Sequence, residues 1–273
     1  MIEASRLTVR TGGRVLLDDV SFTAPSGSVT GIVGPNGSGK TTLLRALVRA
    51  IRPTDGRVSI DGHDLQRRSR RWIARRVAEV GQRTDPDPAL RVVDEVGLGG
   101  LAAHGVLRSG AASFDEEVAA AIDAVGLTPR AGDRVATLSG GELQRVAIAR
   151  AIAQGAGHVL LDEPTNHLDL RARLEVVRLL RRVAPTVVVV LHDLDLASEV
   201  CDHVVMLDRG RVAGWGTPRA LLTPWLIDRV YDVSTRVSAS ADGQTHFSFA
   251  LPAPVTQPAP VTQPAPPPRK AAP

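Results

Sequence analysis

The sequence predicts an α/β protein whose mainly parallel sheet is covered by helices. Short β-branched runs that end in Gly or Asp alternate with helical stretches. A strand over Val29–Val33 precedes a helix over Lys40–Ala50, and a strand over His158–Leu161 precedes a helix over Leu170–Arg182. A third strand is predicted over Thr186–Leu191. This alternation is typical of parallel strands that are joined by crossover helices.

Two regions depart from this alternation. Near the N-terminus, Arg6–Arg10, Val15–Phe22 and Arg57–Asp61 read as strands with tight turns, which suggests a small antiparallel sheet. The middle of the chain, about Val92–Ala153, is mostly helical, with Gly and Pro between the helical stretches. We therefore expect an antiparallel β subdomain at the start and a helical subdomain, about residues 84–153, inserted into the α/β core.

The end of the chain has a different composition. The six residues of Pro252–Gln257 recur as Pro258–Gln263, and more prolines follow. Such a repeat favours an extended polyproline conformation and cannot form ladders or helices. We predict one domain over residues 1–235, a short extension over 236–251 and a proline-rich disordered tail over 252–273. A docking peptide for a partner is the alternative for the tail.

Composition and charge restrict the classes of protein to consider. The formal net charge of +4 over 273 residues is modest and spread along the chain, so it does not argue for nucleic acid or a lipid surface. Cys201 is the only cysteine, which excludes an intramolecular disulfide and predicts a buried thiol. No secretory signal is expected, and the longest strongly apolar run, Val187–Leu191, is too short to span a bilayer.

A glycine-rich loop lies between the first core strand and its helix. It matches the pattern G-x-x-x-x-G-K-[ST] and consists of Gly34, Pro35, Asn36, Gly37, Ser38, Gly39, Lys40 and Thr41, followed by Thr42. Glycines let the backbone wrap around phosphates with its N–H groups pointing inward, and a helix start favours anions. Lys40 is then expected to reach the β- and γ-phosphates of ATP, Thr41 to hold Mg²⁺, and Thr42 to contact the α-phosphate. The agreement of motif and context favours this over an ordinary capping turn.

Polar side chains follow two other core strands. Asp162 and Glu163 end the apolar run Val159–Leu161, and His192 ends Val187–Leu191. Sites of α/β proteins gather at the carboxyl edge of the sheet. We expect Asp162 to hold Mg²⁺ and Glu163 to act as the general base on the attacking water. His192 could orient that water, although a histidine at a strand end is usually structural.

The segment Leu138–Gln144 resembles the signature motif of ATP-binding-cassette ATPases. Other family motifs occur in order: Gln82 matches the Q-loop, Asn166–Asp169 the D-loop and His192 the switch histidine. The resemblance covers about residues 3–235 and implies a P-loop NTPase core. It implies that Gln82 assists catalysis and metal binding, and that Ser139, Gly140 and Gly141 close on the nucleotide of a second copy of the chain.

A finer resemblance is to ATPases of importers for iron–siderophore, haem or cobalamin. It is carried by Asn166–Asp169, by Leu191–Ala197 and by a C-terminal run from Gly216 to Val233. It implies a peripheral subunit on the cytoplasmic face of the membrane, with transmembrane permease subunits as partners, a substrate-binding protein acting indirectly, and no nucleic acid. An exporter subunit, another metal importer and a soluble nucleic-acid-acting ATPase are the alternatives. Only one cassette is present, and Lys40 and Ser139 are too close for a long coiled coil, which speaks against the soluble relatives.

The chain departs from the family where the adenine base is held. The family usually places an aromatic residue near position 11, and this chain has Arg10–Gly13 there. Arg10 is the residue that could lie over the base instead. In a second departure, Leu98–His104 replaces the stretch that importers often show after the Q-loop. That segment is expected to face the membrane partner.

Overall fold

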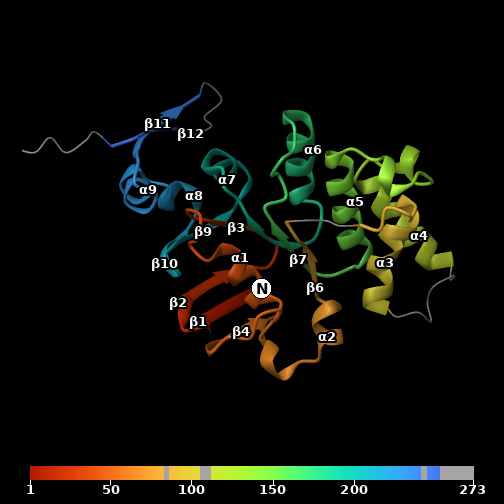
Figure 1. The fold of residues 1–273 in the computed structure, drawn as a ribbon, viewed down its shortest axis with the longest axis horizontal. Helices are drawn as coiled ribbons and strands as arrows, with labels where there is room; N and C mark the ends of the chain where they lie inside the picture. The colour runs from red at the N-terminus through yellow and green to blue at the C-terminus, as the bar shows by residue number, and fades with distance from the viewer. Residues whose placement is uncertain (83–85, 105–111, 241–244, 253–273) are drawn as a thin grey trace, which may run out of the picture.

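The computed structural model describes residues 1–82, 86–104, 112–240 and 245–252. Figure 1 shows a core sheet in the middle, a second sheet that carries the N-terminus below it, and a group of helices at one side. Nearly all of the predicted proline-rich tail, residues 253–273, lies outside the described residues.

The core sheet has six strands in the order β10-β9-β3-β8-β7-β6. Neighbouring strands are parallel except for the pair of β9 and β10, so the predicted mainly parallel α/β fold is confirmed. Every residue of β3, β7 and β8 is buried, as expected for strands with both faces covered. The strands span Val29–Val33 (β3), Val77–Val80 (β6), His158–Asp162 (β7), Thr186–Val190 (β8), His203–Asp208 (β9) and Arg211–Gly216 (β10).

The N-terminal sheet has four antiparallel strands in the order β2-β1-β4-β5, which confirms the predicted β subdomain. The strands span Ile2–Thr11 (β1), Arg14–Ala24 (β2), Asp55–Ile60 (β4) and His63–Asp64 (β5). One face of this sheet covers α1 (Lys40–Leu47), because Leu7, Leu17, Leu43 and Leu44 share one buried core cluster. This packing places the start of β2 beside the start of α1.

The predicted helix over Lys40–Ala50 ends earlier, at Leu47. The reason is Arg49, whose backbone is left-handed (φ 56°). Its guanidinium donates to the carbonyl oxygens of Leu65 (2.9 Å) and Arg68 (2.5 Å). In this position the Arg49 backbone leaves the helix, and its side chain holds the segment of Leu65 and Arg68. Local sequence did not indicate this long-range contact.

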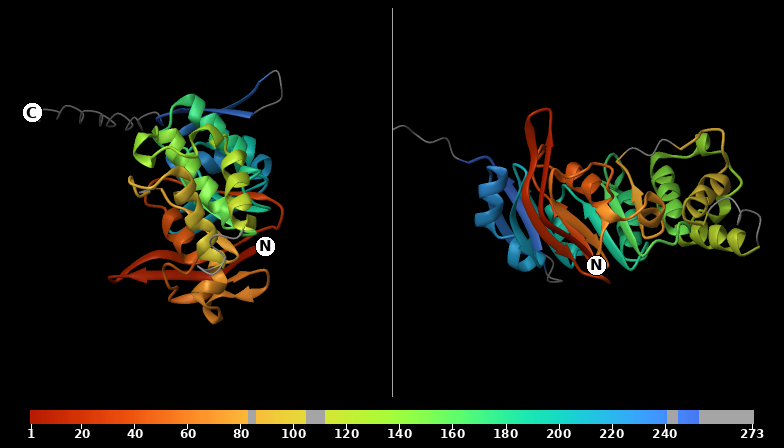
Figure 2. Two further views of the ribbon diagram at one scale, coloured as in Figure 1. Left: turned by 90° about the vertical axis from the view of Figure 1, so that its right-hand side faces the viewer. Right: turned by 90° about the horizontal axis from the view of Figure 1, so that it is seen from below.

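The helices of the inserted region pack beside the β6 end of the core sheet (Figure 2). Three long helices, α3 (Val92–His104), α4 (Ala112–Ala124) and α5 (Gly140–Ala153), contact one another. A Cβ at Gly99 would lie 2.0 Å from the carbonyl oxygen of Arg150, so α3 and α5 approach closely there. Within the described residues before β7, the remaining helical segments are α2 (Arg70–Ala74) and the 3₁₀ turns Leu65–Arg67, Thr128–Arg130 and Val135–Thr137.

The C-terminal third contains elements that the sequence reading missed. Helix α6 (Leu170–Leu180) was predicted, whereas three short helices and a hairpin were not. The short helices are α7 (Leu194–Val200), α8 (Pro218–Leu221) and α9 (Pro224–Tyr231). The antiparallel hairpin of β11 (Ser234–Ala239) and β12 (Thr245–Ala250) packs on α7 and α9, with Phe247 buried. The predicted short extension therefore carries a hairpin.

Cys201 follows α7 and is buried, as predicted. A Cβ at Gly31 would lie 2.7 Å from its Sγ atom, so the thiol packs directly against β3. Burial raises the pKa of the Cys201 thiol to about 12, and the neighbouring Asp202 carboxylate adds to the rise. Because the thiolate is the nucleophile, its fraction at pH 8 should fall roughly a thousandfold on folding. We expect iodoacetamide to label Cys201 quickly in 6 M guanidinium and hardly at all in the folded chain, as measured by mass spectrometry.

Candidate functional site

The glycine-rich loop of Gly34–Gly39 connects β3 to α1. Gly39 precedes α1 with φ 103°, and no side chain caps this helix, so its first backbone N–H groups are free for a ligand. Gly34 has φ 149°, and a Cβ there would lie 2.3 Å from the carbonyl oxygen of Leu207. Only glycine fits at that position. The loop is therefore held tightly against β9 while its donors remain open.

Lys40 begins α1 and is buried, with 6% of its surface exposed. Its Nζ donates to the carbonyl oxygens of Gly34 (2.8 Å) and Pro35 (3.0 Å). Burial lowers the pKa of Lys40, and the charges of Glu163 and Asp162 partly oppose that shift. The ammonium group thus donates to the backbone of the glycine-rich loop, where a bound phosphate could take the place of these carbonyl groups.

Asp162 at the end of β7 faces the start of α1. The Thr41 hydroxyl lies 3.5 Å from Asp162 Oδ1, and Asp162 is 4% exposed. Burial raises the pKa of Asp162, and the hydrogen bond from Thr41 opposes the rise. A carboxylate and a hydroxyl are oxygen ligands of the kind that Mg²⁺ takes, and Mg²⁺ usually needs few protein ligands beside phosphate and water. The pair fits such an ion, although no group of three or more His, Cys, Asp or Glu within the described residues is placed to hold a metal.

Glu163 is the point at which three predicted motifs meet. Its Oε2 accepts hydrogen bonds from the amides of Gln82 (2.7 Å) and Asn166 (2.5 Å), and its Oε1 contacts His192 Nε2. The Glu163 backbone is left-handed (φ 52°), a conformation that costs free energy in a residue with a Cβ and that is found often at functional sites. The side chain is 9% exposed. Asn166 was predicted as part of the D-loop but not as a site residue. Its contact with Glu163 follows from the tight turn after β7, in which Asn166 N donates to Glu163 O (3.2 Å).

A cleft of about 510 Å³ is lined by several of these residues, including Lys40, Thr41 and Glu163. Beside the glycine-rich loop, Lys40, Thr41, Thr42 and Glu163, it is lined by residues that sequence motifs do not reveal: Val15, Leu16, Arg209 and Gly210. Gly210 connects these parts, because its N–H donates to Ser38 O (3.0 Å) and its carbonyl accepts from Asp18 N (2.8 Å). The β9–β10 turn therefore fixes the loop to the N-terminal sheet.

Val15, and not Arg10, lines the cleft beside the glycine-rich loop. Val15 is 47% exposed and lines the cleft, whereas Arg10 lines another hollow with Asp18 and Asp19. Val15 can offer apolar surface to a flat base. We expect Val15→Ser to weaken ATP binding about fivefold, because roughly 1 kcal/mol of apolar contact is lost. Arg10→Ala should change the dissociation constant less than twofold. Isothermal titration with a non-hydrolysable ATP analogue checks both, and equal effects would contradict this assignment.

The predicted signature residues do not join this cleft. Ser139 precedes α5 and is engaged with Glu142, donating to Glu142 Oε2 (2.9 Å) and accepting from Glu142 N (3.4 Å). Backbone contact with Ser139 lowers the pKa of Glu142. Gly140 is exposed, and a Cβ there would meet nothing within 4 Å. Ser139, Gly140 and Gly141 thus form a second helix start that is open on its outer side.

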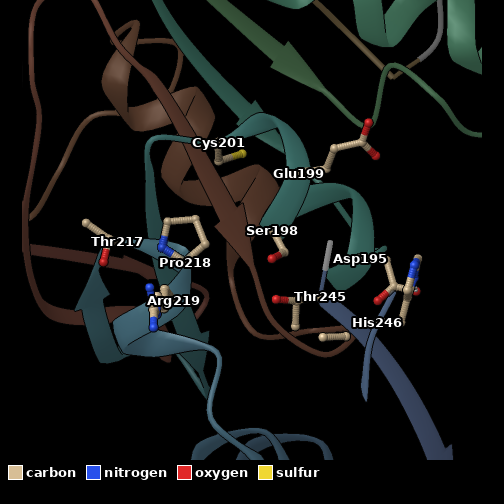
Figure 3. Close-up of a pocket in the computed structure, with 10 residues that line it drawn as sticks. Asp195, Ser198, Glu199, Cys201, Thr217, Pro218, Arg219, Thr245 and His246 are labelled. Carbon is tan, nitrogen blue, oxygen red and sulfur yellow. Dashed lines mark ion pairs between the residues drawn. The ribbon is translucent and has the colours of Figure 1, made fainter. Parts of the chain in front are cut away.

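A larger hollow of about 680 Å³ lies on the other side of α7 (Figure 3). The lining residues come from α7 and the residue after it, from the start of α8, and from both strands of the hairpin: Asp195, Ser198, Glu199, Cys201, Thr217, Pro218, Arg219, Ala239, Thr245 and His246. Asp195 Oδ1 accepts a hydrogen bond from Phe247 N (2.7 Å), and its carboxylate lies 4.0 Å from His246 Nδ1. These contacts attach the C-terminal hairpin to α7. The phosphate-binding features lie in the other cleft.

Comparisons with known proteins agree with this geometry. A family model described as "ABC transporter" matches residues 17–166. The chain is 39% identical to the Hemin import ATP-binding protein HmuV of Rhodopseudomonas palustris, over 92% of this chain and 94% of the relative. It is 38% identical to the Cobalamin import ATP-binding protein BtuD of Halobacterium salinarum, over 93% and 64%. It is 34% identical to the Ferric enterobactin transport ATP-binding protein FepC of Escherichia coli, over 84% and 86%.

Solved structures show the same fold. The dimeric structure of MJ0796, a bacterial ABC transporter cassette, matches with a TM-score of 0.70 and 28% identity, over 80% of this chain and 99% of that one. A dimeric post-hydrolysis state of the same cassette bound to ADP and phosphate matches with a TM-score of 0.69 and 27% identity, over 80% and 99%. None of the helices in the described part of this chain is long and apolar enough to cross a membrane.

Proposed function

This chain belongs to the ABC transporter family of ATP-binding-cassette ATPases, and we propose that it is the subunit whose ATP hydrolysis powers a membrane importer for haem, iron–siderophore or cobalamin. The observation that carries the proposal is the convergence of Gln82, Asn166 and His192 on Glu163, in the same cleft region as Lys40 and Thr41. The cargo classes are those of its relatives.

In this proposal Glu163 is the general base. A carboxylate in hydrogen-bond reach of the attacking water takes its proton as the water adds to the γ-phosphate. Both carboxylate oxygens of Glu163 are occupied by its neighbours, so the water must replace one of these contacts. His192 contacts Oε1 and Gln82 contacts Oε2, so whichever of the two contacts remains orients the base. Gln82 follows β6 and His192 follows β8, the two strands that flank β7, so both side chains lie beside Glu163.

The glycine-rich loop and Lys40 bind the phosphates. The open N–H groups at the start of α1 face the phosphate oxygens, and Lys40 exchanges its two carbonyl contacts for the β- and γ-phosphates. Thr41 and Asp162 would hold Mg²⁺, with Gln82 completing the site. When bound, the ion neutralises charge that develops on the phosphate oxygens.

A second copy of the chain completes each site. Ser139, Gly140 and Gly141 form an exposed helix start that does not reach the cleft of their own chain. Backbone N–H groups at a helix start are good donors to a phosphate. We propose that this helix start closes on the γ-phosphate held by the partner copy, so that two copies enclose two ATP molecules. The dimeric cassette structures of relatives support this arrangement.

The inserted helices are the proposed contact with the permease. Val93 and Leu98 on α3 are 39% and 43% exposed, which leaves apolar surface on the helical side of the molecule. We infer that transmembrane permease subunits bind there and hold the chain at the cytoplasmic face of the membrane. A substrate-binding protein would act on the far side through the permease, and no nucleic acid is involved.

Deletion of this chain from its own cell tests the proposal. Uptake of labelled haem, ferric siderophore and cobalamin should fall for one of the three, and the wild-type chain should restore it while Glu163→Gln should not. The permease subunits should co-purify with the chain, and cargo should stimulate ATP hydrolysis in the assembled complex. Unchanged uptake of all three cargoes would sink the importer proposal.

A further inference from the structure

Helix α6 lies between the signature helix α5 and the switch helix α7 (Figure 1). It begins directly after the predicted D-loop, Asn166–Asp169, where the Asp169 side chain accepts from Ala172 N (2.8 Å) and caps the helix. The segment that caps α6 also carries Asn166, which contacts Glu163. The first turn of α6 is therefore tied to Glu163 through this short segment.

The side of α6 that faces α5 packs against the signature segment, Leu138–Gln144, and the helix that begins there. A Cβ at Gly141 would lie 2.6 Å from the Cβ of Ala172, so the two helices touch at their first turns. The Arg145 side chain on α5 forms an ion pair with Glu175 on α6, and these side chains are 19% and 29% exposed. Arg171 adds a second contact to Glu175 at 3.1 Å. Helix α6 is thus in direct contact with the helix that begins at the signature segment.

The other side of α6 contacts the loop of His192 and Asp193 between β8 and α7, which we call the switch loop. Arg173 forms an ion pair with Asp193, the residue that follows His192, and both side chains are about one-third exposed. Asp193 also caps α7, because its Oδ1 accepts from Leu196 N (2.9 Å). Burial opposes ionisation of Asp193, but the Leu196 and Arg173 contacts outweigh it and lower its pKa. Arg173 thus holds the residue next to the switch histidine.

Other contacts hold α7 independently of Arg173. At the far ends of the two helices, Arg181 Nη1 lies 3.1 Å from Asp202 Oδ1, and its Nη2 donates to Val200 O (3.0 Å). On the outer side, Asp195 Oδ1 accepts from Phe247 N. Figure 3 shows Asp195 beside His246, the residue before Phe247 on β12. Removing the Arg173 side chain should therefore release the switch loop and leave α7 in place.

We propose that Arg173 is a positioning residue for ATP hydrolysis, which holds His192 on Glu163 through Asp193 and links the switch loop to the signature segment through α6. The proposal rests on the ATPase function proposed above. If the signature segment serves the partner's nucleotide and His192 serves its own, α6 provides a direct physical connection between the two ATP sites of a dimer. Arg173 itself touches neither nucleotide.

Steady-state hydrolysis by four single variants tests this role. Arg173→Met keeps the length of the side chain and removes its charge, whereas Asp193→Asn keeps the acceptor that caps α7. Each should lower kcat about tenfold, as expected for loss of a charge-assisted hydrogen bond, with the ATP dissociation constant changed less than about twofold. Arg173→Lys keeps the charge and should recover most of the rate. Arg181→Met, the matched control on the same two helices, should stay within about twofold.

A double variant distinguishes positioning from general structural support. If Arg173 acts through His192, then Arg173→Met should cause no further loss of kcat in the His192→Ala background, because residues that act as a unit are not additive. Circular dichroism and thermal melting show whether each variant is folded, and Asp193→Asn, which removes the charge of the partner carboxylate, decides the matter if Arg173→Met does not fold.

The outcomes separate this proposal from the function on which it rests. A parent chain that binds no ATP and hydrolyses none would overturn the proposed function. A parent that hydrolyses ATP while Arg173→Met keeps its full rate would overturn only the role of Arg173. So would an equal fractional loss in the wild-type and His192→Ala backgrounds, or a loss of ATP affinity that is as large as the loss of kcat.

Discussion

Glu163→Gln should lower ATP turnover by about 10²–10⁴-fold, the range that general-base catalysis contributes. The Gln side chain has nearly the same shape and keeps an oxygen for hydrogen bonds from Gln82 and Asn166, but it cannot take a proton from water. ATP binding should persist, because Lys40 and the glycine-rich loop are unchanged. A coupled-enzyme assay measures turnover, and filter binding with labelled ATP measures retention.

Glu199→Gln is the matched control for this variant. Glu199 is an exposed carboxylate on α7 and lines the hollow of Figure 3, away from Glu163. Its loss should leave turnover within about twofold. If Glu163→Gln hydrolysed ATP at the rate of the parent chain, the assigned base would be wrong, since no other carboxylate makes the contacts of Glu163 with Gln82, Asn166 and His192 in the described residues.

Gly140→Asp should abolish hydrolysis without weakening ATP binding to a single chain. A Cβ at Gly140 would meet nothing within 4 Å, so the aspartate should fit the fold of its own chain. It would, however, place a negative charge where the partner's γ-phosphate is proposed to lie, and like charges at close range are strongly unfavourable in a site without water. We expect at least a hundredfold loss of turnover, as found when one donor to a developing charge is lost.

Gly132→Asp tests whether that effect is specific. Gly132 is exposed in the same inserted region, and a Cβ there would also meet nothing within 4 Å. This variant adds the same charge outside the signature segment, Leu138–Gln144, and should keep near-normal turnover. If Gly140→Asp were as active as Gly132→Asp, the signature segment would have no role at a nucleotide.

Local sequence was sufficient to predict the buried core strands β3, β7 and β8 and the residues at their ends, whereas β9 and β10 of the same sheet were not predicted. The runs around Val29–Val33, His158–Leu161 and Thr186–Leu191 are apolar and β-branched because these strands are buried on both faces. The residues that follow them must then lie at one edge of a parallel sheet. This is why Lys40, Asp162, Glu163 and His192 could be named from the sequence.

Contacts between distant segments could not be predicted in the same way. Val15 reaches the nucleotide cleft because the N-terminal sheet packs on α1, and no motif encodes that packing. The pairing of Arg173 with Asp193 depends on the relative placement of α6 and α7. The hairpin of β11 and β12 was missed because each strand buries a single residue, Thr235 or Phe247, and so shows no continuous apolar run.

The most direct test of the composite site is the mass of the Glu163→Gln chain in solution with and without Mg-ATP, measured by sedimentation equilibrium. We predict a monomer without nucleotide and a dimer with two bound ATP molecules, because each glycine-rich loop needs the signature segment of the other copy. Adding Gly140→Asp to Glu163→Gln should return the protein to a monomer that still binds one ATP. A Glu163→Gln chain that binds ATP at saturation and stays monomeric would contradict the composite site.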